Sequence, residues 1–285
     1  MDKGTILRTA ANNYKIGNCL GRGAQGSVYE GFRSDGLKFA IKLIRVITAD
    51  SLRRQRTEGW VYQQFPNHFV TLVDWNLECS RPFLVLEFCI HGSARTQLNY
   101  LSTWHSVSVP LLTQTATALQ DLHQRGYLYR DFKPDNILLT QFGFGPWIAK
   151  LGDAGLICLP KEISMTQMTT FARGTPEYMA PELRRVGALY TREAEAFAFG
   201  ISAVELLSGA RPSAGSEVLC GPTELRQLLT DMISVDPKKR PSLKNARLKF
   251  EIASQNLKER NQALTVLGLV GLGLLTAFSI GKRNG

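Results

Sequence analysis

Short alternating stretches of apolar and polar residues dominate the first 90 residues of the chain. These stretches are 14–20, 27–32, 38–44, 69–76 and 83–88. Gly-rich and Asp-Gly turns separate them, which is typical of strands. Between them, Asp50 and Ser51 can cap a helix over 49–64. The pattern predicts five strands and one helix, which form a small α+β lobe over about 14–90.

From residue 91 onward the apolar residues recur mainly at helical spacing. The predicted helices are 109–126, 193–209 and 221–233, and the predicted strand pair is 137–139 with 148–151. Gly126 is a residue type that commonly ends a helix. The pattern predicts a mainly helical second lobe over about 91–250, and the expected fold class is therefore α+β with two lobes.

The segment 263–281 contains 19 residues without a charge. A helix of this length measures about 28 Å, which is close to the thickness of the hydrocarbon core of a bilayer. A buried C-terminal helix is the alternative. We predict a transmembrane helix over 263–281, a juxtamembrane linker over 251–262 and a short tail over 282–285. We expect 1–13 to be an N-terminal extension without a secretory signal, and the chain to be tail-anchored with its bulk in the cytosol.

The charge of the chain indicates anionic partners. The formal net charge is +10, and all acidic residues precede Gln262. Nucleotide phosphates and lipid headgroups are such partners. No long basic run with interleaved aromatic residues occurs, so no nucleic-acid partner is expected. The five cysteines form no CxxC pair, which favours a reducing compartment over a disulfide framework or a zinc site.

A glycine-rich stretch, GRGAQGSVYEG, lies between two of the predicted strands. Gly21, Gly23 and Gly26 form a GxGxxG pattern, followed by Val28. A dinucleotide-binding unit places such glycines between a strand and a helix, so that class is disfavoured. The backbone of a glycine-rich hairpin can instead approach phosphate groups closely.

Lys42 ends the apolar strand that follows this stretch. A surface lysine with a solvated ammonium group is one interpretation. The other is a phosphate clamp, which requires an acidic partner, and Glu58 on the next predicted helix is well placed for that role.

The segment LYRDFKPDNILL places Asp131, Lys133 and Asn136 within six residues, and Asp153 follows at a strand end. Phosphoryl transfer needs a carboxylate that orients the attacking hydroxyl and an ammonium group near the phosphate. It also needs hard oxygen ligands for Mg²⁺, which Asn136 and Asp153 can supply.

In chain order, five motifs stand at characteristic spacing. They are Gly21-x-Gly23-x-x-Gly26-x-Val28, Ala40-Ile41-Lys42, Arg130-Asp131-x-Lys133-Pro134-x-Asn136, Asp153-x-Gly155 and Ala180-Pro181-Glu182. The chain resembles eukaryotic-type (Hanks-type) serine/threonine protein kinases over about residues 14–247. The resemblance implies a two-lobed kinase domain over 14–250, ATP and Mg²⁺ as cofactors, and proteins with Ser or Thr acceptors as substrates.

The resemblance also implies roles for individual residues. The implied catalytic residues are Lys42, Glu58, Asp131 and Lys133, and the implied Mg²⁺ ligands are Asn136 and Asp153. The implied nucleotide-binding residues are Leu20, Gly21, Gly23, Gly26, Val28, Ala40, Lys42, Leu86, Glu87 and Cys89. Lys42 contacts the α- and β-phosphates and pairs with Glu58, while Asp131 orients the acceptor hydroxyl. Thr175 is expected to bond near Asp131.

Three positions depart from the family pattern. Tyr129 replaces the usual His, Ala154 replaces the usual Phe, and Glu195 replaces a buried Asp. We interpret Tyr129 as a packing residue that fills the volume given up at Ala154. A helix that the family usually has is missing or minimal between Gly209 and Pro222. A catalytically impaired pseudokinase scaffold that binds nucleotide is therefore an alternative, and a small-molecule kinase is a third.

The segment 153–182 corresponds to the activation segment of the family. Its candidate phosphorylation sites are Ser164, Thr166, Thr169 and Thr170, of which Thr169 and Thr170 are favoured. The resemblance implies that Arg130 meets such a phosphate and that Glu182 pairs with Arg240. Self-association for trans-autophosphorylation is a further expectation.

Overall fold

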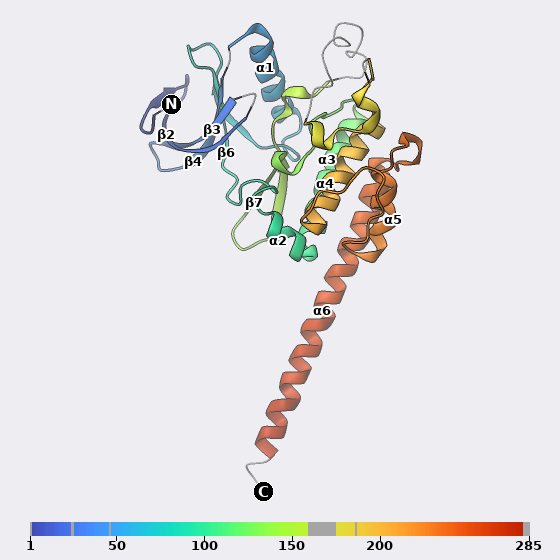
Figure 1. Cartoon of the computed structure of the whole chain (residues 1–285). Coiled ribbons are helices and arrows are strands. Elements are labelled where there is room, and N and C mark those ends of the chain that lie inside the picture. The colour runs from blue at the N-terminus through green and yellow to red at the C-terminus, as the bar shows by residue number, and fades with distance from the viewer. Residues whose placement is uncertain (1, 24–25, 46, 159–174, 186, 282–285) are drawn as a thin grey trace.

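The computed structural model describes residues 2–23, 26–45, 47–158, 175–185 and 187–281, with side chains up to residue 263. Two lobes are evident, and a long C-terminal helix leaves the second one (Figure 1). The N-lobe consists of β1 (Ile6–Arg8), β2 (Asn13–Arg22), β3 (Gly26–Arg33), β4 (Lys38–Ile44), α1 (Ala49–Gln64), β5 (Leu72–Asn76) and β6 (Phe83–Glu87). The strands form an antiparallel sheet in the order β1-β2-β3-β4-β6-β5.

Within the described residues this sheet has six strands, so the prediction of five was wrong. The extra strand, β1, lies in the segment that was predicted as an extension outside the domain. Asp74 in β5 connects the far edge of the sheet to this region. Its Oδ2 accepts hydrogen bonds from Thr9 Oγ1 (2.6 Å), Asn12 Nδ2 (3.2 Å) and Tyr14 OH (3.0 Å). The N-terminal segment therefore ties the two edges of the sheet together.

The helix α1 covers the predicted residues 49–64, but its cap lies two residues before Asp50. Its N-cap is Thr48, whose hydroxyl accepts from the backbone of Ser51, while the Ser51 hydroxyl accepts from the backbone of Thr48. This reciprocal capping box satisfies amide groups that have no partner inside the helix. The helix is largely polar, but Glu58, Val61 and Tyr62 are buried against the rest of the molecule. Capping and burial together fix the position of Glu58.

The C-lobe is mainly helical, as predicted. It contains α2 (Leu98–Thr103), α3 (His105–Gln124), β7 (Ile137–Gln141), β8 (Trp147–Leu151), α4 (Arg192–Ser208), α5 (Thr223–Met232) and α6 (Leu243–Gly281). Every α4 residue from Ala194 to Leu207 is buried, so this helix forms the centre of the lobe. The segment between α4 and α5 is fully described and contains no helix, which confirms the predicted gap between Gly209 and Pro222.

A row of aromatic rings runs through the core from α1 to α6. Successive centroid distances are 5.8 Å for Tyr62–Phe69, 6.0 Å for Phe69–Tyr129, 6.4 Å for Tyr129–Phe132, 5.4 Å for Phe132–Phe199 and 5.6 Å for Phe199–Phe250. All six side chains are buried. Aromatic rings at such spacing stabilise the fold by more than the burial of their apolar surface alone. The row connects the helix that carries Glu58 with the centre of the C-lobe.

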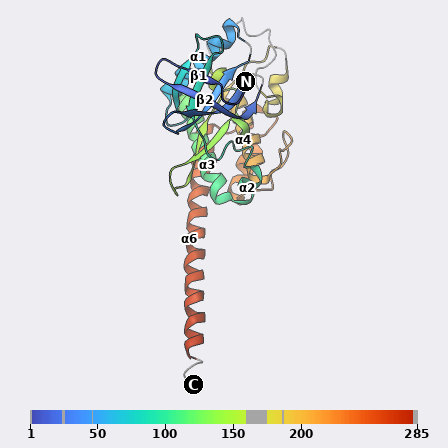
Figure 2. The same ribbon diagram turned by 90° about the vertical axis from the view of Figure 1, so that its left-hand side faces the viewer.

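The predicted linker 251–262 is part of α6, a helix without interruption from Leu243 to Gly281. Phe250 and Ala253 are buried, Leu257 packs against the core, and the residues from Lys258 to Ala263 are exposed. Beyond this point α6 projects away from the lobe in both views (Figures 1 and 2). No described helix is both long enough and apolar enough to cross a membrane. The side chains of 264–281, where we predicted the span, lie outside the described residues.

Candidate active site

Lys42 joins the two lobes at the candidate site. It lies in β4, paired with Val28 on one side and Leu84 on the other, and its side chain is buried. Its Nζ donates to both carboxylate oxygens of Glu58 at 2.7 Å and to Asp153 Oδ1 at 2.9 Å. The predicted pair with Glu58 is therefore formed. The contact with Asp153 brings a residue from the end of the β7–β8 hairpin into the same group.

The charges around Lys42 stabilise one another. Burial lowers the pKa of Lys42, but the carboxylates of Asp153 and Glu58 outweigh it and hold that pKa above its usual value. Burial raises the pKa of the Glu58 carboxyl, and Lys42 opposes this shift. Glu58 also accepts hydrogen bonds from Gln55 Nε2 (3.1 Å) and from the hydroxyl of Tyr62. These extra bonds satisfy the buried carboxylate, as a buried ion pair requires.

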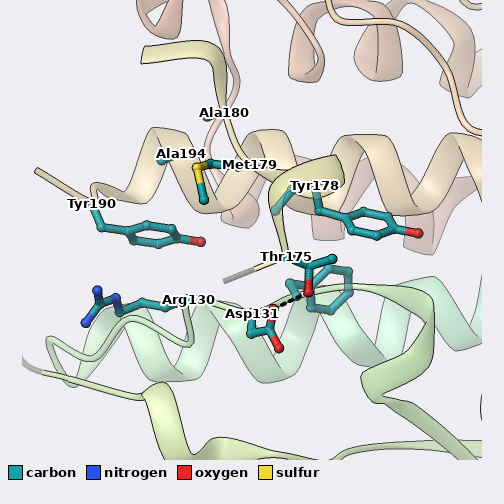
Figure 3. Close-up of a pocket in the computed structure, with 10 residues that line it drawn as sticks. Arg130, Asp131, Thr175, Tyr178, Met179, Ala180, Tyr190 and Ala194 are labelled. Atoms are coloured by element: carbon teal, nitrogen blue, oxygen red, sulfur yellow. Dashed lines mark hydrogen bonds between the residues drawn. The ribbon is translucent and has the colours of Figure 1, made fainter. Parts of the chain in front are cut away.

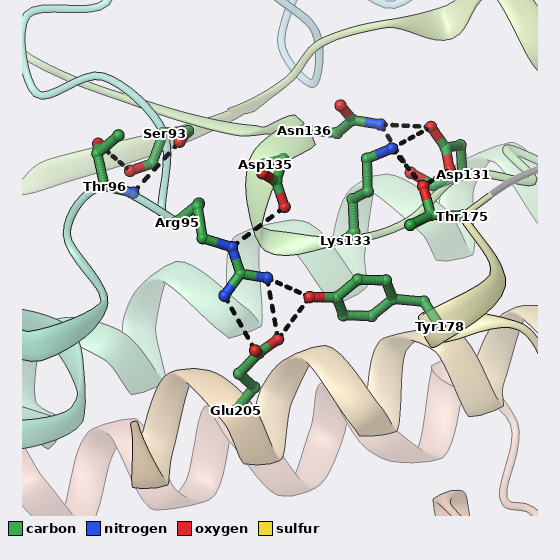
Figure 4. A network of polar contacts seen from close by, with 10 residues as sticks. All are labelled: Ser93, Arg95, Thr96, Asp131, Lys133, Asp135, Asn136, Thr175, Tyr178 and Glu205. Carbon is green, nitrogen blue, oxygen red and sulfur yellow. Dashed lines mark hydrogen bonds and ion pairs between the residues drawn. The ribbon is translucent and has the colours of Figure 1, made fainter. Parts of the chain in front are cut away.

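Asp131 lies at the centre of a second group, in the loop before β7 (Figure 4). Its carboxylate accepts from Lys133 Nζ at 2.8 Å, from Asn136 Nδ2 at 3.0 Å and from Thr175 Oγ1 at 2.9 Å. The last contact confirms the expected bond of Thr175 near Asp131. Asn136 ends a short 3₁₀ turn that Pro134 begins. The turn places Asp131, Lys133 and Asn136 on one side of the loop.

Glu195 holds the backbone of this loop from α4. Its Oε1 accepts from the backbone amides of Tyr129 (2.7 Å) and Arg130 (2.8 Å), and its Oε2 lies 2.6 Å from Nε2 of His123. Arg130 has a φ of +74°, in the left-handed region that side chains disfavour. The bonds to Glu195 therefore hold a strained backbone. Glu195 is one methylene longer than the Asp of the family pattern, and the structure accommodates this length. The contact of Glu195 with His123 was not predicted from the sequence.

Tyr129 has a polar contact as well as a packing role. Its ring is fully buried beside Phe69 and Phe132, and its hydroxyl donates to the carbonyl oxygen of Gly152. Burial raises the pKa of Tyr129 well above 10, so the hydroxyl keeps its proton. Ala154 is also fully buried in the same core. The prediction of packing alone was therefore incomplete.

The glycine-rich hairpin and the strands beside it bring the implied nucleotide-binding residues together. Gly23 N–H donates to Gly26 O at 2.9 Å, which closes the turn. A Cβ added to Gly26 would lie 2.0 Å from Leu43 O, so only glycine fits there. A Cβ added to Gly21 or Gly23 would meet no described atom within 4 Å, which leaves room for a ligand above the hairpin.

The other implied adenine contacts lie on adjacent strands and just beyond them. Ala40 in β4 pairs directly with Leu86 in β6. The backbone amide of Glu87 already donates to Thr71 O at 2.9 Å, so this amide is not free for a ligand. Burial, followed by the charge of Glu87, raises the pKa of the Cys89 thiol to about 12. The remaining predicted residue, Leu20, is 47% exposed at the end of β2.

The donor set fits a magnesium ion. Asn136 uses its amide nitrogen toward Asp131, which leaves the carbonyl oxygen, and Asp153 uses only Oδ1 toward Lys42. Within the described residues no cluster of three His, Cys, Asp or Glu side chains forms a metal cage. Mg²⁺ is commonly bound through one or two carboxylates together with substrate phosphates. One carboxylate and one amide oxygen beside a phosphate site therefore match that preference.

A network that sequence reasoning missed supports the segment around Tyr178 (Figure 4). Arg95 donates to Glu205 Oε1 at 2.9 Å and to Asp135 Oδ2 at 3.2 Å, and also to the hydroxyl of Tyr178. Tyr178 in turn donates to Glu205 Oε2 at 2.6 Å. Glu205, a buried acidic residue in the mainly apolar second half of α4, was the available signal, because a buried charge requires a partner.

The predicted ion pair between Glu182 and Arg240 is formed, with two bonds of 2.6 and 2.8 Å. The four candidate phosphorylation sites in 164–170 lie outside the described residues. Arg130, which was expected to meet a phosphate there, lies 3.5 Å from Cys158 Sγ and 5.8 Å from the ring centre of Tyr190. Its Nε has no hydrogen-bond partner among the described residues.

A small pocket of about 10 Å³, partly open to solvent, lies directly beside Asp131. Figure 3 shows Thr175 and Tyr178 along one side and Arg130 with Tyr190 at the other. Met179 and Ala180 add apolar surface to its wall. The space beside Asp131 is therefore small, and apolar and aromatic side chains form most of its wall.

Comparison with known proteins points in the same direction. The family model described as "Protein kinase domain" matches residues 14–249. Wall-associated receptor kinase-like 5 of Arabidopsis thaliana is 32% identical over 216 residues. The matched region covers 72% of this chain and 28% of the length of that relative. Wall-associated receptor kinase-like 17 of the same plant is 28% identical over 98% of the chain, spanning 34% of that protein. Probable serine/threonine-protein kinase PBL12, also from Arabidopsis thaliana, is 33% identical over 72% of the chain, spanning 50% of it.

Proposed function

Since the chain belongs to the protein kinase family, we propose that it transfers the γ-phosphate of ATP to serine and threonine hydroxyls of proteins. The observation that carries this proposal is the position of Lys42 Nζ, within 2.9 Å of both Glu58 and Asp153. An ammonium group held between a helix carboxylate and a metal-binding carboxylate is the arrangement that phosphoryl transfer requires.

The residues of this chain divide the work as follows. Lys42 binds the α- and β-phosphates, and Glu58 holds Lys42 in place. Asp131 accepts a hydrogen bond from the acceptor hydroxyl and orients it, and Lys133 neutralises charge on the transferred group. Asn136 and Asp153 hold Mg²⁺, which when bound neutralises the charge of the phosphates. The glycine-rich hairpin, Val28, Ala40 and Leu86 cover the nucleotide.

Two observations favour serine and threonine over tyrosine as acceptors. Lys133 donates to both Asp131 and Thr175, and Lys133 and Thr175 are the residues that resemble the serine/threonine-specific pattern of the family. PBL12, a relative at 33% identity, carries a serine/threonine kinase name.

The test is phosphoamino acid analysis after incubation of the full chain with radiolabelled MgATP and a generic basic protein. Label on phosphoserine and phosphothreonine, absent with Asp131→Asn, supports the proposal. Label confined to phosphotyrosine would contradict the acceptor specificity, and ATP hydrolysis without any labelled protein would contradict the substrate class.

A pseudokinase scaffold is the second candidate, favoured by the fully buried Ala154 at the position of the family Phe. Such a scaffold binds nucleotide without transferring phosphate. Thermal unfolding with and without MgATP distinguishes the cases, because a ligand stabilises only the state that binds it. Stabilisation by MgATP without transfer identifies the scaffold, whereas stabilisation with transfer identifies the enzyme.

We further propose that phosphorylation of the segment 153–182 by a second copy regulates the enzyme. Arg130 supports this proposal, because its Nε lacks a partner among the described residues and a phosphate would supply one. Mass spectrometry of wild type and Asp131→Asn tests it. Phosphate on Thr169 or Thr170 of the wild type alone is expected, and a rate independent of protein concentration would contradict transfer between copies.

The proposed location is a membrane, with the kinase domain in the cytosol. The uncharged run 263–281 supports this, because 19 such residues match the thickness of a bilayer. Extraction of membranes with alkaline carbonate tests it. Retention of the full chain in the membrane pellet is expected, and release into the supernatant would contradict the tether.

A further inference from the structure

Five aromatic side chains gather on one face of the C-lobe, away from the candidate active site. This aromatic face consists of Tyr100, Trp104, Phe142, Phe144 and Trp147. Trp104 is 54% exposed, Phe142 is 71% exposed and Phe144 is completely exposed. Large aromatic residues together at a surface mark an interaction site, because water contact with so much apolar area is unfavourable.

Three of these five rings are in contact with one another. The rings of Tyr100 and Trp147 are stacked with centroids 5.0 Å apart, and Tyr100 lies 6.4 Å from Trp104. Phe142 and Phe144 occupy the turn between β7 and β8, and Trp147 follows that turn at the start of β8. Neither 97–104 nor 141–147 contains a charged residue. An uncharged aromatic surface fits an apolar or interfacial partner better than a charged protein surface.

The course of α6 indicates which partner that is. Arg247 Nε donates to Gln120 Oε1 at 2.7 Å, so the first turns of α6 lie beside the last turns of α3. Asn256, further along α6, contacts Glu224 at the beginning of α5. Figures 1 and 2 both show α6 leaving at the end of the C-lobe where α2 lies. Trp104 joins α2 to α3 at that same end.

The distance between the lobe and the uncharged run is short. Leu257 is the last α6 side chain described as packing against the core, and the run begins at Ala263. Six helical residues advance by about 9 Å. Because α6 has no break in this region, a bilayer crossed by 263–281 begins close to the aromatic face.

We propose that the aromatic face is a membrane-contact surface that inserts into the interfacial region of a lipid bilayer. The proposal rests on the proposed tether, which brings the bilayer to this face. Tryptophan and tyrosine favour the membrane–water interface, because their rings are apolar and carry a polar group. Phe144 at the hairpin tip reaches the acyl chains. Lys258 and Arg260, both exposed on α6, lie where anionic headgroups attract them.

This contact fixes the orientation of the kinase domain. The helix α2, which carries Tyr100, lies at the opposite end of the two-lobed body from α1 (Figure 1). A bilayer against α2 and the β7–β8 turn therefore leaves α1 and the N-lobe turned toward the cytosol. The enzyme then acts on substrates at a defined height above the membrane, because α6 continues into the run without a flexible joint.

Brominated lipids provide the test, because they quench tryptophan only on contact. The chain contains four tryptophans, Trp60, Trp75, Trp104 and Trp147, and none lies in the run 263–281. The full chain is reconstituted in vesicles of phosphatidylcholine and phosphatidylserine, with and without brominated acyl chains. The variant is Trp104→Phe. Its matched control is Trp75→Phe in the N-lobe, since Trp75 is 49% exposed and Trp104 is 54% exposed.

We expect brominated acyl chains to remove the same absolute amount of tryptophan fluorescence per molecule from wild type and Trp75→Phe, and about half that amount from Trp104→Phe. The variant Ser279→Cys tests the transmembrane tether separately. If 263–281 spans the bilayer, a membrane-impermeant thiol reagent added outside the vesicles labels the introduced thiol only after the vesicles are opened. Mass spectrometry of the peptide that contains this position reads the labelling. Protection of the introduced thiol, with equal quenching of wild type and both tryptophan variants, overturns the aromatic contact but keeps the tether. Labelling in closed vesicles, with the expected quenching, overturns the tether but supports the contact.

A second copy of the chain is the other occupant that the experiment distinguishes. Sedimentation in detergent compares wild type with Trp104→Phe. A dimer that becomes monomeric in the variant, with no loss of lipid quenching, overturns the proposal in favour of self-association. The same oligomeric state in both proteins, with loss of lipid quenching in the variant, supports the membrane.

Discussion

The hydroxyl of Tyr129 donates a hydrogen bond to the carbonyl oxygen of Gly152, the residue that directly precedes Asp153. Both ends of this bond are buried. It links the loop that carries Asp131 to the residue next to the proposed metal ligand. Asp153 itself has a φ of +47°, a left-handed backbone that needs support from its surroundings. Tyr129 therefore positions Asp153 through the backbone, at a site where Ala154 provides little volume.

Removal of this hydroxyl tests that relationship. Tyr129→Phe leaves the Gly152 carbonyl buried without its partner, and we expect the free energy of unfolding to fall by about 1–3 kcal/mol. The rate of phosphate transfer falls as well, because Asp153 is held less firmly. Urea unfolding and steady-state kinetics measure both. The control is Tyr127→Phe, two residues earlier, and equal effects of the two variants would contradict the role of Tyr129.

Variants of Glu195 test how the loop is held. Asp is one methylene shorter and cannot reach His123 and the two loop amides together, so Glu195→Asp loses about 1–3 kcal/mol of stability. Glu195→Gln retains an oxygen for the amides of Tyr129 and Arg130 and loses less. The melting temperature is expected to decrease from wild type to Gln to Asp. An Asp variant as stable and active as wild type would refute this order.

We expect the hydrogen bonds that Asp74 accepts to make the stability of the chain depend on pH. Burial raises the pKa of Asp74, but hydrogen bonds from Thr9, Asn12 and Tyr14 outweigh it, so that pKa is lower in the folded chain. A lowered pKa contributes stability above the unfolded value of about 3.9, and this contribution is lost as the pH falls through the folded value.

The unfolding free energy of Asp74→Asn should therefore lie below that of wild type by a constant amount from about pH 8 to pH 5. The difference should close as the pH falls further. The exposed Glu78→Gln variant is the control and should follow wild type throughout. A difference between Asp74→Asn and wild type that persists at acidic pH would show that the ionised carboxylate is not the stabilising form.

The thiol of Cys89 should react slowly. Burial and the charge of Glu87 raise its pKa from 9.0 to about 12, so about a thousandfold less thiolate is present at pH 8. We expect iodoacetamide to label the exposed Cys19 at least about 100-fold faster than Cys89. Peptide mapping by mass spectrometry measures both rates on one sample. Comparable labelling of the two in the folded chain would contradict the burial of Cys89.

The sequence predicted much of the site because its residues stand in short motifs. Lys42 with Glu58, Asp131 with Thr175, and Glu182 with Arg240 meet as expected. The two lobes and the helix-free segment before α5 also agree with prediction. In each case a local pattern or a family motif carried the information, so no long-range packing had to be known.

The features that the sequence did not reveal depend on distant contacts. Glu195 and His123 are 72 residues apart, and Arg95 and Glu205 are 110 apart, so no periodic pattern connects them. The strand β1 has three residues, too few for a recognisable alternation. The polar first half of α6 is helical because it packs along α3 and α5, contacts that the local pattern of 251–262 does not display.

The most direct test of the central claim is a single-turnover transfer of labelled γ-phosphate by the full chain, compared with Asp131→Asn. Asn keeps the shape of the side chain, and circular dichroism and MgATP binding confirm that the variant is folded. We predict transfer by wild type, reduced by about 10²-fold or more in the variant. Two folded proteins that both bind MgATP, yet show the same negligible transfer, would contradict the claim and identify a nucleotide-binding scaffold.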